Sequence, residues 1–333
     1  MSGQIAVVNA GAWGTALAVL LARGGHAVRL WCRRPKLAAD VTRRRENVDY
    51  LPGVEIPSLV EPTASMAVAL DGPRAVVLVP ISRAVRETAS QVAPFIDSTT
   101  PVMHASKGLE LGSLRRLSEV IAEELGRPAD TVAVLSGPTL AGEVACGLPA
   151  AAVVAAADPG LASTFQALLH GPTLRVYTST DVVGVELCGA LKNVVALATG
   201  ASDGLGLGDN TRAALITRSL VEIGRLVQAA GGDPRTVAGL AGLGDIVLTC
   251  TSRHSRNHWA GEQIGRGRPL ADIVASTRQV IEGIPAAQAA VALAARYNVD
   301  VPVCTQVNQV LHHGAPVEAV LARLMGREAT AEL

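Results

Sequence analysis

The chain contains very few aromatic residues. Phe, Trp and Tyr together make up 2% of its 333 residues, whereas hydrophobic residues make up 49%. Ala, Val and Leu must therefore fill the cores, packed between helices and strands. A chain of this length is long for a single core, so we expect two domains.

Net charge is absent as well, because 29 Lys and Arg residues balance 29 Asp and Glu residues. Without a block of like charges, the sequence does not predict binding to nucleic acid or to an anionic membrane. The five cysteines lie far apart with no CxxC pair, which is typical of reduced cytosolic thiols. The N-terminus shows no basic stretch or cleavage site, and the apolar runs are shorter than the roughly 18 residues of a membrane span. These features predict a cytoplasmic protein without a membrane span.

Two classes of catalytic signature are missing. The histidines, among them His254, His258, His312 and His313, are scattered, and no HExxH or Cys/His spacing predicts a metal site. No GxSxG or similar nucleophile motif is present, so hydrolysis has no candidate residue. We expect chemistry that needs no metal.

The first half of the sequence alternates short β-like runs with helical stretches. IAVVNA, AVRLWC, AVVLVP, PVMHAS and TVAVLSG are apolar runs typical of a parallel sheet covered on both faces, and AAAVVAA and LRVYTST are candidate edge strands. From DVVGVELCGALKNVVALATG onward, apolar residues recur at helical spacing. We expect an α/β domain with a mostly parallel sheet over residues 1–180 and an all-α domain over residues 181–333.

Residues 5–18, IAVVNAGAWGTALA, have the pattern of a strand, a tight turn and a helix start. In the glycine-rich dinucleotide fingerprint, the second glycine lets backbone N–H groups approach the pyrophosphate, and the third allows close packing of helix on strand. Gly11 and Gly14 occupy these positions, and Asn9, which tolerates turn conformations, replaces the first glycine. The stretch predicts a Rossmann-type nucleotide loop, with an ordinary tight turn as the alternative.

The second β-like run ends in LWCRRPK, which carries Arg33, Arg34 and Lys36 with no acid before Asp40. An NAD site places Asp or Glu here to bind the ribose 2′-hydroxyl, whereas guanidinium groups suit a 2′-phosphate. The sequence therefore favours NADP(H), with NAD(H) as the second cofactor. A solvated basic turn is the alternative.

Further motifs give a resemblance to a known family. The stretches AGAWGTALA, SKGLE, LSGPTLAGEVACGLPAA, GVELCGALKNVVALATG, GLGDIVLTCTS, SRN and IEG resemble, in order, motifs of the NAD(P)-dependent glycerol-3-phosphate dehydrogenases. The resemblance covers nearly the whole chain. It implies hydride transfer that interconverts dihydroxyacetone phosphate and sn-glycerol 3-phosphate, feeding glycerophospholipid synthesis. It also implies a homodimer and an active site in a cleft between the two domains.

Lys192 lies in CGALKNVVALA, among apolar and small residues. Desolvation lowers the pKa of such a lysine, as general acid/base catalysis at neutral pH requires, although a lysine extended from a helix end is the alternative. The resemblance implies the acid/base role. Asp245, in GLGDIVLT, needs a cation or hydrogen-bond donors if it is buried, and Lys192 is the natural partner. An N-cap carboxylate is the alternative for Asp245.

Lys107 and the segment Gly137, Pro138 and Thr139 follow predicted strands, where open α/β sheets place their ligands. Each could also be a surface turn. The resemblance implies that Lys107 contacts cofactor and substrate and polarises the carbonyl. It also implies that Gly137 and Thr139 line the substrate.

Ser255, Arg256 and Asn257 offer a hydroxyl, a planar guanidinium fork and an amide, which together suit a phosphate. A solvated loop is the alternative, and the resemblance implies that they bind the phosphate end of the substrate. The loop and the basic turn predict cofactor contacts at Asn9, Gly11, Ala12, Trp13, Gly14, Arg33 and Arg34. The resemblance implies further cofactor contacts at Lys107, Ala141, Arg256, Val280 and Glu282.

Three residues depart from the family pattern: Asn9, Ala12 where serine is common, and Leu140 where an aromatic is usual. The first two bear on cofactor affinity. Leu140 bears on pocket shape, so a related small phosphorylated ketone is an alternative substrate.

Two other classes of function are alternatives. A dehydrogenase of the 3-hydroxyacid or 6-phosphogluconate type would share the architecture but carries its catalytic lysine in a different motif. A non-catalytic nucleotide-binding homologue fits Asn9, but the intact Lys192, Lys107 and Asp245 argue against it.

Overall fold

The computed structural model describes residues 3–277, 280–326 and 328. The chain divides into two compact units, Met1–Glu186 and Leu187–Leu333. The division falls inside one helix, α8 (Val182–Gly204), so the chain passes from the first unit to the second without a loop.

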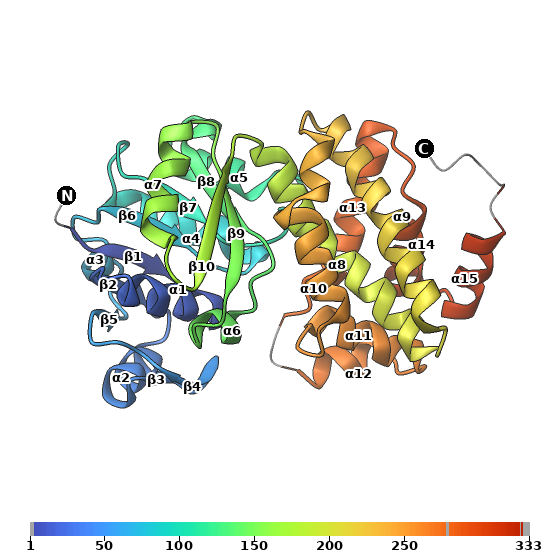
Figure 1. Ribbon diagram of the computed structural model, residues 1–333, viewed down its shortest axis with the longest axis horizontal. Helices are drawn as coiled ribbons and strands as arrows, with labels where there is room; N and C mark the ends of the chain where they lie inside the picture. The colour runs from blue at the N-terminus through green and yellow to red at the C-terminus, as the bar shows by residue number, and fades with distance from the viewer. Residues whose placement is uncertain (1–2, 278–279, 327, 329–333) are drawn as a thin grey trace. The chain divides into compact units, whose positions relative to one another are not determined.

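The first unit is built on a twisted sheet with strand order β10-β9-β8-β7-β6-β1-β2-β5 (Figure 1). All neighbouring strands run parallel except β8 and β9, so the expected mostly parallel sheet is confirmed. AAAVVAA and LRVYTST form β9 and β10 at one edge. The strands are β1 (Ile5–Val8), β2 (Val28–Trp31), β3 (Glu46–Asn47), β4 (Leu51–Glu55), β5 (Val60–Thr63), β6 (Ala75–Leu78), β7 (Val102–His104), β8 (Val132–Ser136), β9 (Ala150–Ala155) and β10 (Leu174–Ser179).

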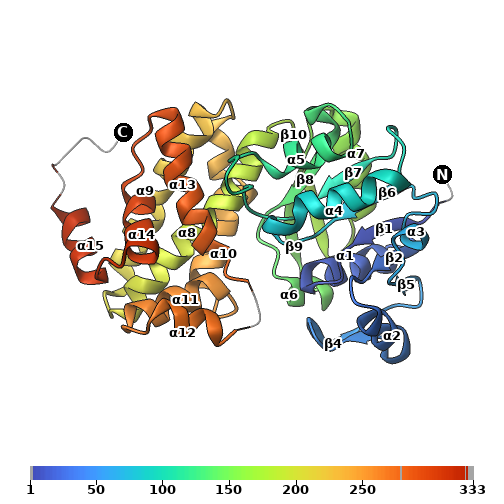
Figure 2. The same ribbon diagram turned by 180° about the vertical axis from the view of Figure 1, so that it is seen from behind.

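Helices cover both faces of this sheet (Figures 1 and 2). Along β1, Ile5 and Val7 belong to the core beneath α1 and α7, while Ala6 and Val8 belong to the core beneath α4 and α5. Burial on both faces explains why the strands are continuous apolar runs. The helices are α1 (Ala12–Arg23), α2 (Pro35–Arg44), α3 (Met66–Ala69), α4 (Val85–Val92), α5 (Leu117–Glu124), α6 (Ala141–Ala145) and α7 (Pro159–Leu169), with short η1 (Ser82–Ala84), η2 (Ala93–Phe95) and η3 (Ala129–Thr131).

The described residues of the second unit form helices joined by short loops and contain no strand, as the apolar spacing predicts. The glycine-rich GLGLGDN breaks α8 from α9, and Gly206 and Gly208 take positive φ angles of 74° and 80° there. Its elements after α8 are α9 (Gly208–Ala229), η4 (Pro234–Ala238), the π-helical turn η5 (Leu240–Gly244), α10 (Asp245–Thr251), α11 (Arg256–Gly265), α12 (Leu270–Ala275), α13 (Gly283–Tyr297), α14 (Pro302–His313) and α15 (Val317–Met325).

The helix α8 corrects one expectation about apolar length. It is 23 residues long, and by length and composition alone it could cross a membrane, although the unbroken apolar runs of the sequence are shorter. The reason is that the few polar residues scattered along α8 interrupt its apolar runs but leave its mean hydropathy as high as that of a membrane-spanning helix. Of its most apolar 18-residue window, 83% is buried inside the protein, as in the core helix of a globular fold.

Four glycines bring α8 and α11 into backbone contact. Gly200 and Gly204 on α8 face Gly261 and Gly265 on α11, and a Cβ added to any of them would collide with backbone of the opposite helix. Glycines four residues apart on each helix allow this close approach. The packing fixes the start of α11, which carries SRN, relative to α8, which carries Lys192.

Candidate active site

The predicted nucleotide loop is a tight turn between β1 and α1. Asn9 has a φ of 93°, a left-handed conformation that glycine adopts without cost and that Asn tolerates. Its side-chain amide donates to the Val79 carbonyl at a long 3.4 Å. A Cβ on Gly14 would collide with the Asn9 carbonyl, so helix and turn need glycine there. The turn conformation expected for Asn9 is therefore confirmed.

A buried residue that the sequence reasoning missed holds this loop in place. The Asn47 side chain is fully buried, and its Nδ2 donates to the Ala10 carbonyl at 3.0 Å and to Thr15 Oγ1 at 2.7 Å. Asn47 lies in β3, far from the loop in sequence. In the sequence, only its amide side chain could have indicated this role, and the segment around it has the composition of an ordinary surface turn.

The loop fits the pyrophosphate of a dinucleotide. The α1 helix begins after Gly11 with no acidic residue in its first turn, so this turn places no negative charge against a phosphate at the positive end of the helix dipole. A Cβ added to Gly11 would meet no atom within 4 Å, so the space beside it is open. The sheet order also reverses between β1 and β6, which is where open α/β sheets bind their ligands.

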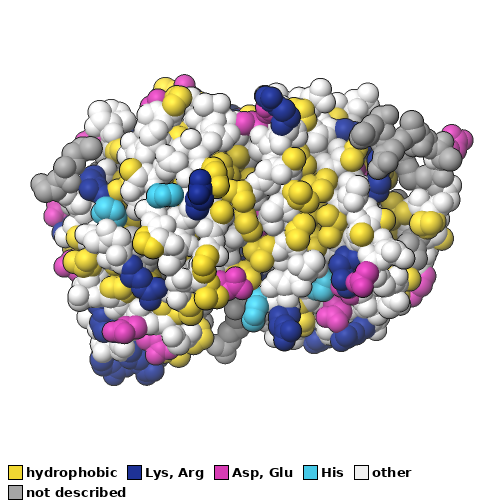
Figure 3. All heavy atoms as spheres, in the orientation of Figure 1, with side chains coloured by type: hydrophobic (Ala, Val, Ile, Leu, Met, Phe, Trp, Pro, Cys, Tyr) yellow, Lys and Arg dark blue, Asp and Glu magenta, His cyan; other side chains and the backbone are white. Residues whose placement is uncertain are grey.

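Basic side chains gather around α2, at the lower left of Figure 3. Arg33 and Arg34 are both exposed and directly follow β2. Arg34 donates to Asp49 Oδ2 at 2.6 Å and to the Tyr50 hydroxyl at 3.4 Å, so an acid does lie beside these arginines. The sequence did not indicate this acid, because it follows 15 residues after Arg34 on the turn between β3 and β4.

Lys107, Gly137 and Thr139 lie together at the ends of the neighbouring strands β7 and β8. Lys107 Nζ and Thr139 Oγ1 each donate to the Gly137 carbonyl at 3.2 Å. Gly137 has a φ of 134°, and a Cβ there would press on the backbone of Ala152, so only glycine fits this turn. The structure thus groups an ammonium and a hydroxyl at the carboxyl edge of the sheet, beside Ala141 at the start of α6.

Lys192 and Asp245 form the buried ion pair that the sequence predicts. Lys192 Nζ lies 2.6 Å from Asp245 Oδ1, and the two side chains are 10% and 1% exposed. Thr249 Oγ1 accepts a second hydrogen bond from Nζ at 2.7 Å and itself donates to the Asp245 carbonyl at 2.6 Å. Thr249 was missed, although it lies one helical turn after Asp245 on α10. The cluster holds an ammonium with little water around it.

The start of α8, ahead of Lys192, is anchored inside the first unit. The buried Glu186 accepts hydrogen bonds from the Ser118 backbone N–H and from Arg116, each at 2.9 Å, and lies 3.1 Å from His104 Nε2. Burial alone would raise the pKa of Glu186, but these partners lower it to about 2. The carboxylate is therefore charged at neutral pH and holds the helix that carries Lys192.

The SRN residues occupy different environments. Ser255 caps α11 by accepting from the His258 N–H, and Arg256 is exposed and donates to the Val280 carbonyl at 3.1 Å. Asn257 is buried, and its amide joins Asn193 Oδ1 and the Gly283 N–H, both at 2.9 Å. Both ends of the Asn257 amide thus bind protein, and it ties α11 to the helix residue next to Lys192. Glu282, just before Gly283, is partly buried.

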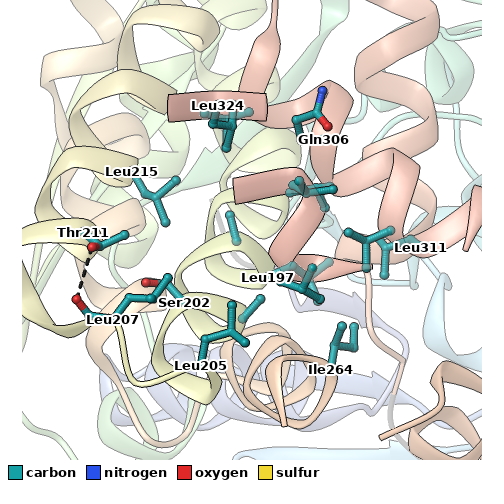
Figure 4. A pocket seen from close by; sticks show the side chains of 17 residues that line it. Leu197, Ser202, Leu205, Leu207, Thr211, Leu215, Ile264, Gln306, Leu311 and Leu324 are labelled. Atoms are coloured by element: carbon teal, nitrogen blue, oxygen red, sulfur yellow. Dashed lines mark hydrogen bonds between the residues drawn. The ribbon is translucent and has the colours of Figure 1, made fainter. Parts of the chain in front are cut away.

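Two pockets in the second unit differ in character. One, with an empty volume of about 540 Å³ that is open to solvent, is lined by Arg253, His254, Ser255 and Arg256 and suits an anion. The other, of about 580 Å³, is apolar and lies among α8, α9, α14 and α15 (Figure 4). No predicted site residue lines the apolar pocket, so the polar one is the better candidate for substrate. The described residues hold no His, Cys, Asp and Glu group that could bind a metal, and all five cysteines are free thiols.

Comparison with known proteins agrees with these features. The models described as NAD-dependent glycerol-3-phosphate dehydrogenase N-terminus and C-terminus match residues 4–162 and 181–322. A protein named glycerol-3-phosphate dehydrogenase, NAD(P)+, from Moorella thermoacetica is 49% identical over 100% of this chain and 98% of its own length. A protein of the same name from Prosthecochloris aestuarii is 47% identical over 99% of both chains. The crystal structure of glycerol-3-phosphate dehydrogenase from Coxiella burnetii has a TM-score of 0.93 at 41% identity, covering 98% of this chain and 99% of that one. The chain is an enzyme that belongs to the NAD-dependent glycerol-3-phosphate dehydrogenase family.

Proposed function

We propose that the protein interconverts dihydroxyacetone phosphate and sn-glycerol 3-phosphate, with Lys192 as the general acid and base. The observation that carries the proposal is the buried cluster of Lys192, Asp245 and Thr249, in a chain whose relatives bear this activity in their names. In a cell, the product would supply glycerophospholipid synthesis.

Each residue of this cluster has a distinct task. When bound, a nicotinamide cofactor supplies or accepts the hydride. In reduction, Lys192 gives a proton to the C2 oxygen of the substrate as the carbonyl becomes an alkoxide. In oxidation, it takes the proton from the C2 hydroxyl. Asp245 holds the ammonium by charge, and Thr249 holds it by a hydrogen bond, so Nζ keeps one position.

The substrate contacts follow from the remaining predicted residues. Lys107, with its ammonium beside the Gly137 carbonyl and Thr139, polarises the substrate carbonyl. Arg256 and Ser255 line the open polar pocket and bind the phosphate. Asn257 contributes by holding α11 against α8, in addition to any contact with substrate.

We propose NADP(H) as the favoured cofactor, with NAD(H) as the second. The support is the pair of exposed arginines, Arg33 and Arg34, after β2. Changing both to glutamine should weaken NADPH binding by about 1.5–3 kcal/mol per lost charged hydrogen bond at most, and weaken NADH much less. Calorimetric titration measures both, and an equal loss for the two cofactors would refute the preference.

The proposed reaction is tested by following NADPH oxidation with dihydroxyacetone phosphate beside other phosphorylated ketones. The panel matters because Leu140 replaces the usual aromatic. A ketone that is reduced faster than dihydroxyacetone phosphate would replace it as the proposed substrate. Lys192→Ala should lower the rate by roughly 10² to 10⁴ while NADPH binding survives. Lys192→Arg is the matched control, since Arg keeps the charge but does not give up its proton in proteins. If Lys192→Arg keeps near-normal turnover, the lysine is not the acid and base.

We also infer a cytoplasmic homodimer, on the family resemblance and the free thiols. Sedimentation velocity of the purified chain, at micromolar concentration with and without NADPH, tests the oligomeric state. A monomer under both conditions would contradict it.

A further inference from the structure

We infer that Asp49 sets the balance between the two cofactors by competing with a 2′-phosphate for Arg34. The inference rests on the proposed cofactor site beside β2. With the non-phosphorylated cofactor, Asp49 stays in place and its carboxylate accepts a hydrogen bond from the ribose hydroxyl. With the phosphorylated cofactor, the phosphate takes over the guanidinium of Arg34.

Arg34 contacts an acid that the residues next to it in the sequence do not indicate. Arg34 precedes α2, and Asp49 and Tyr50 lie on the turn between β3 and β4. Arg34 Nη2 lies 2.6 Å from Asp49 Oδ2, and the guanidinium carbon lies 5.7 Å from the centre of the Tyr50 ring. The hairpin thus brings a carboxylate to the side chain of an arginine that follows the second strand, and sites for the non-phosphorylated cofactor carry their acid at the end of this strand.

The pair is built to exchange partners rather than to stabilise the fold. The Arg34 and Asp49 side chains are 50% and 54% exposed, and ion pairs this exposed contribute little to folding. A phosphate dianion carries more charge than one carboxylate and has three acceptor oxygens, so it attracts the Arg34 guanidinium more strongly. At the same time, the Asp49 charge repels that dianion. Asp49 therefore opposes one cofactor and favours the other.

Neighbouring residues supply the rest of the exchange. Arg33 is exposed, and no partner is found for it among the residues that the structure describes. Tyr50 is also exposed and can keep its contact with the Arg34 guanidinium when Asp49 leaves. Asp40, the first acid after the arginines in sequence, pairs instead with Arg43 at 2.7 Å.

The test is Asp49→Asn, with the dissociation constants of NADPH and NADH measured by calorimetry on the full chain. We expect NADPH to bind about three- to tenfold more tightly and NADH to bind more weakly. Asp40→Asn is the matched control, because it removes one partly buried acid of α2 that is paired with Arg43 rather than with Arg34. This control should change neither the NADPH nor the NADH dissociation constant. Equal changes for both cofactors, or the same effect from Asp40→Asn, would overturn the inference.

A second variant separates competition for Arg34 from general repulsion. In an Arg34→Gln background, Asp49→Asn should improve NADPH binding by less than half as much, because there is no guanidinium left to release. An undiminished effect would overturn the role of Arg34. If the native chain binds neither cofactor, the proposed function itself fails. If the native chain binds both cofactors and Asp49→Asn leaves the ratio of their dissociation constants unchanged, only the competition for Arg34 is refuted.

Discussion

Thr249→Val tests whether the hydroxyl beside Lys192 serves the reaction. The change keeps the shape of the side chain but removes the oxygen that accepts from Nζ at 2.7 Å. A hydrogen bond to a charged group contributes about 1.5–3 kcal/mol. If the whole contribution is felt in the transition state, kcat falls roughly 10- to 150-fold, and this is the upper limit because the bond is also present in the resting enzyme. Asp245 still holds the ammonium, so the loss should be smaller than that of Lys192→Ala.

The assay is the steady-state rate with dihydroxyacetone phosphate and NADPH across pH, with a thermal melt of each variant. Thr249→Ser should restore the rate, because it keeps the hydroxyl. Thr251→Val is the matched control, since it lies on the same helix and its hydroxyl donates only to the Val247 carbonyl. The hydroxyl oxygen binds the ammonium form more strongly than the neutral amine, so the pH–rate profile of Thr249→Val should also move to lower pH. An unchanged kcat and pH profile would refute the reasoning.

Three further variants test other parts of the molecule. Asn9→Gly should keep or tighten NADPH binding in calorimetry and cost only about 0.4–1 kcal/mol in stability, because glycine adds freedom to the unfolded chain while the lost bond to Val79 is long; a marked loss of affinity would give Asn9 a role of its own. Gly14→Ala should weaken NADPH binding at least tenfold and lower the melting temperature, because its Cβ would collide with the Asn9 carbonyl; normal affinity and melting would contradict this packing. Burial raises the pKa of Glu222 from 4.5 to about 7, so the folded state holds a proton that the unfolded state loses. Stability should therefore fall by up to roughly 3 kcal/mol as pH rises from 4.5 to 7, and Glu222→Gln should remove this slope in urea unfolding; the same slope in both proteins would exclude Glu222.

Local patterns were enough to predict the sheet, the helical unit and the turn at Asn9. Apolar runs covered on both faces read as parallel strands, and the replacement of glycine by Asn is informative because few residues accept a φ of 93°. The pairing of Lys192 with Asp245 could also be predicted, since a buried carboxylate needs a cation or hydrogen-bond donors and Lys192 lies among apolar and small residues.

Contacts between distant segments could not be predicted in the same way. Asn47 lies 37 residues from the Ala10 carbonyl that it binds, and Asp49 returns to Arg34 only through the β3–β4 hairpin. Neither residue type is unusual in a polar turn, so nothing local marks them. Thr249 is different, because its spacing from Asp245 places both on one face of a helix, and that signal was available.

The close contact of α8 with α11 changes what a survey of inactivating mutations would find. None of Gly200, Gly204, Gly261 and Gly265 offers a side chain to a ligand, yet any larger residue at one of them would push α11 away from α8. Such a survey should therefore rank these glycines with Lys192, and a second substitution on the facing helix could not rescue the first, because no residue is smaller than glycine. At these four positions, the close backbone spacing of the two helices limits substitution, and no contact with substrate or cofactor is involved.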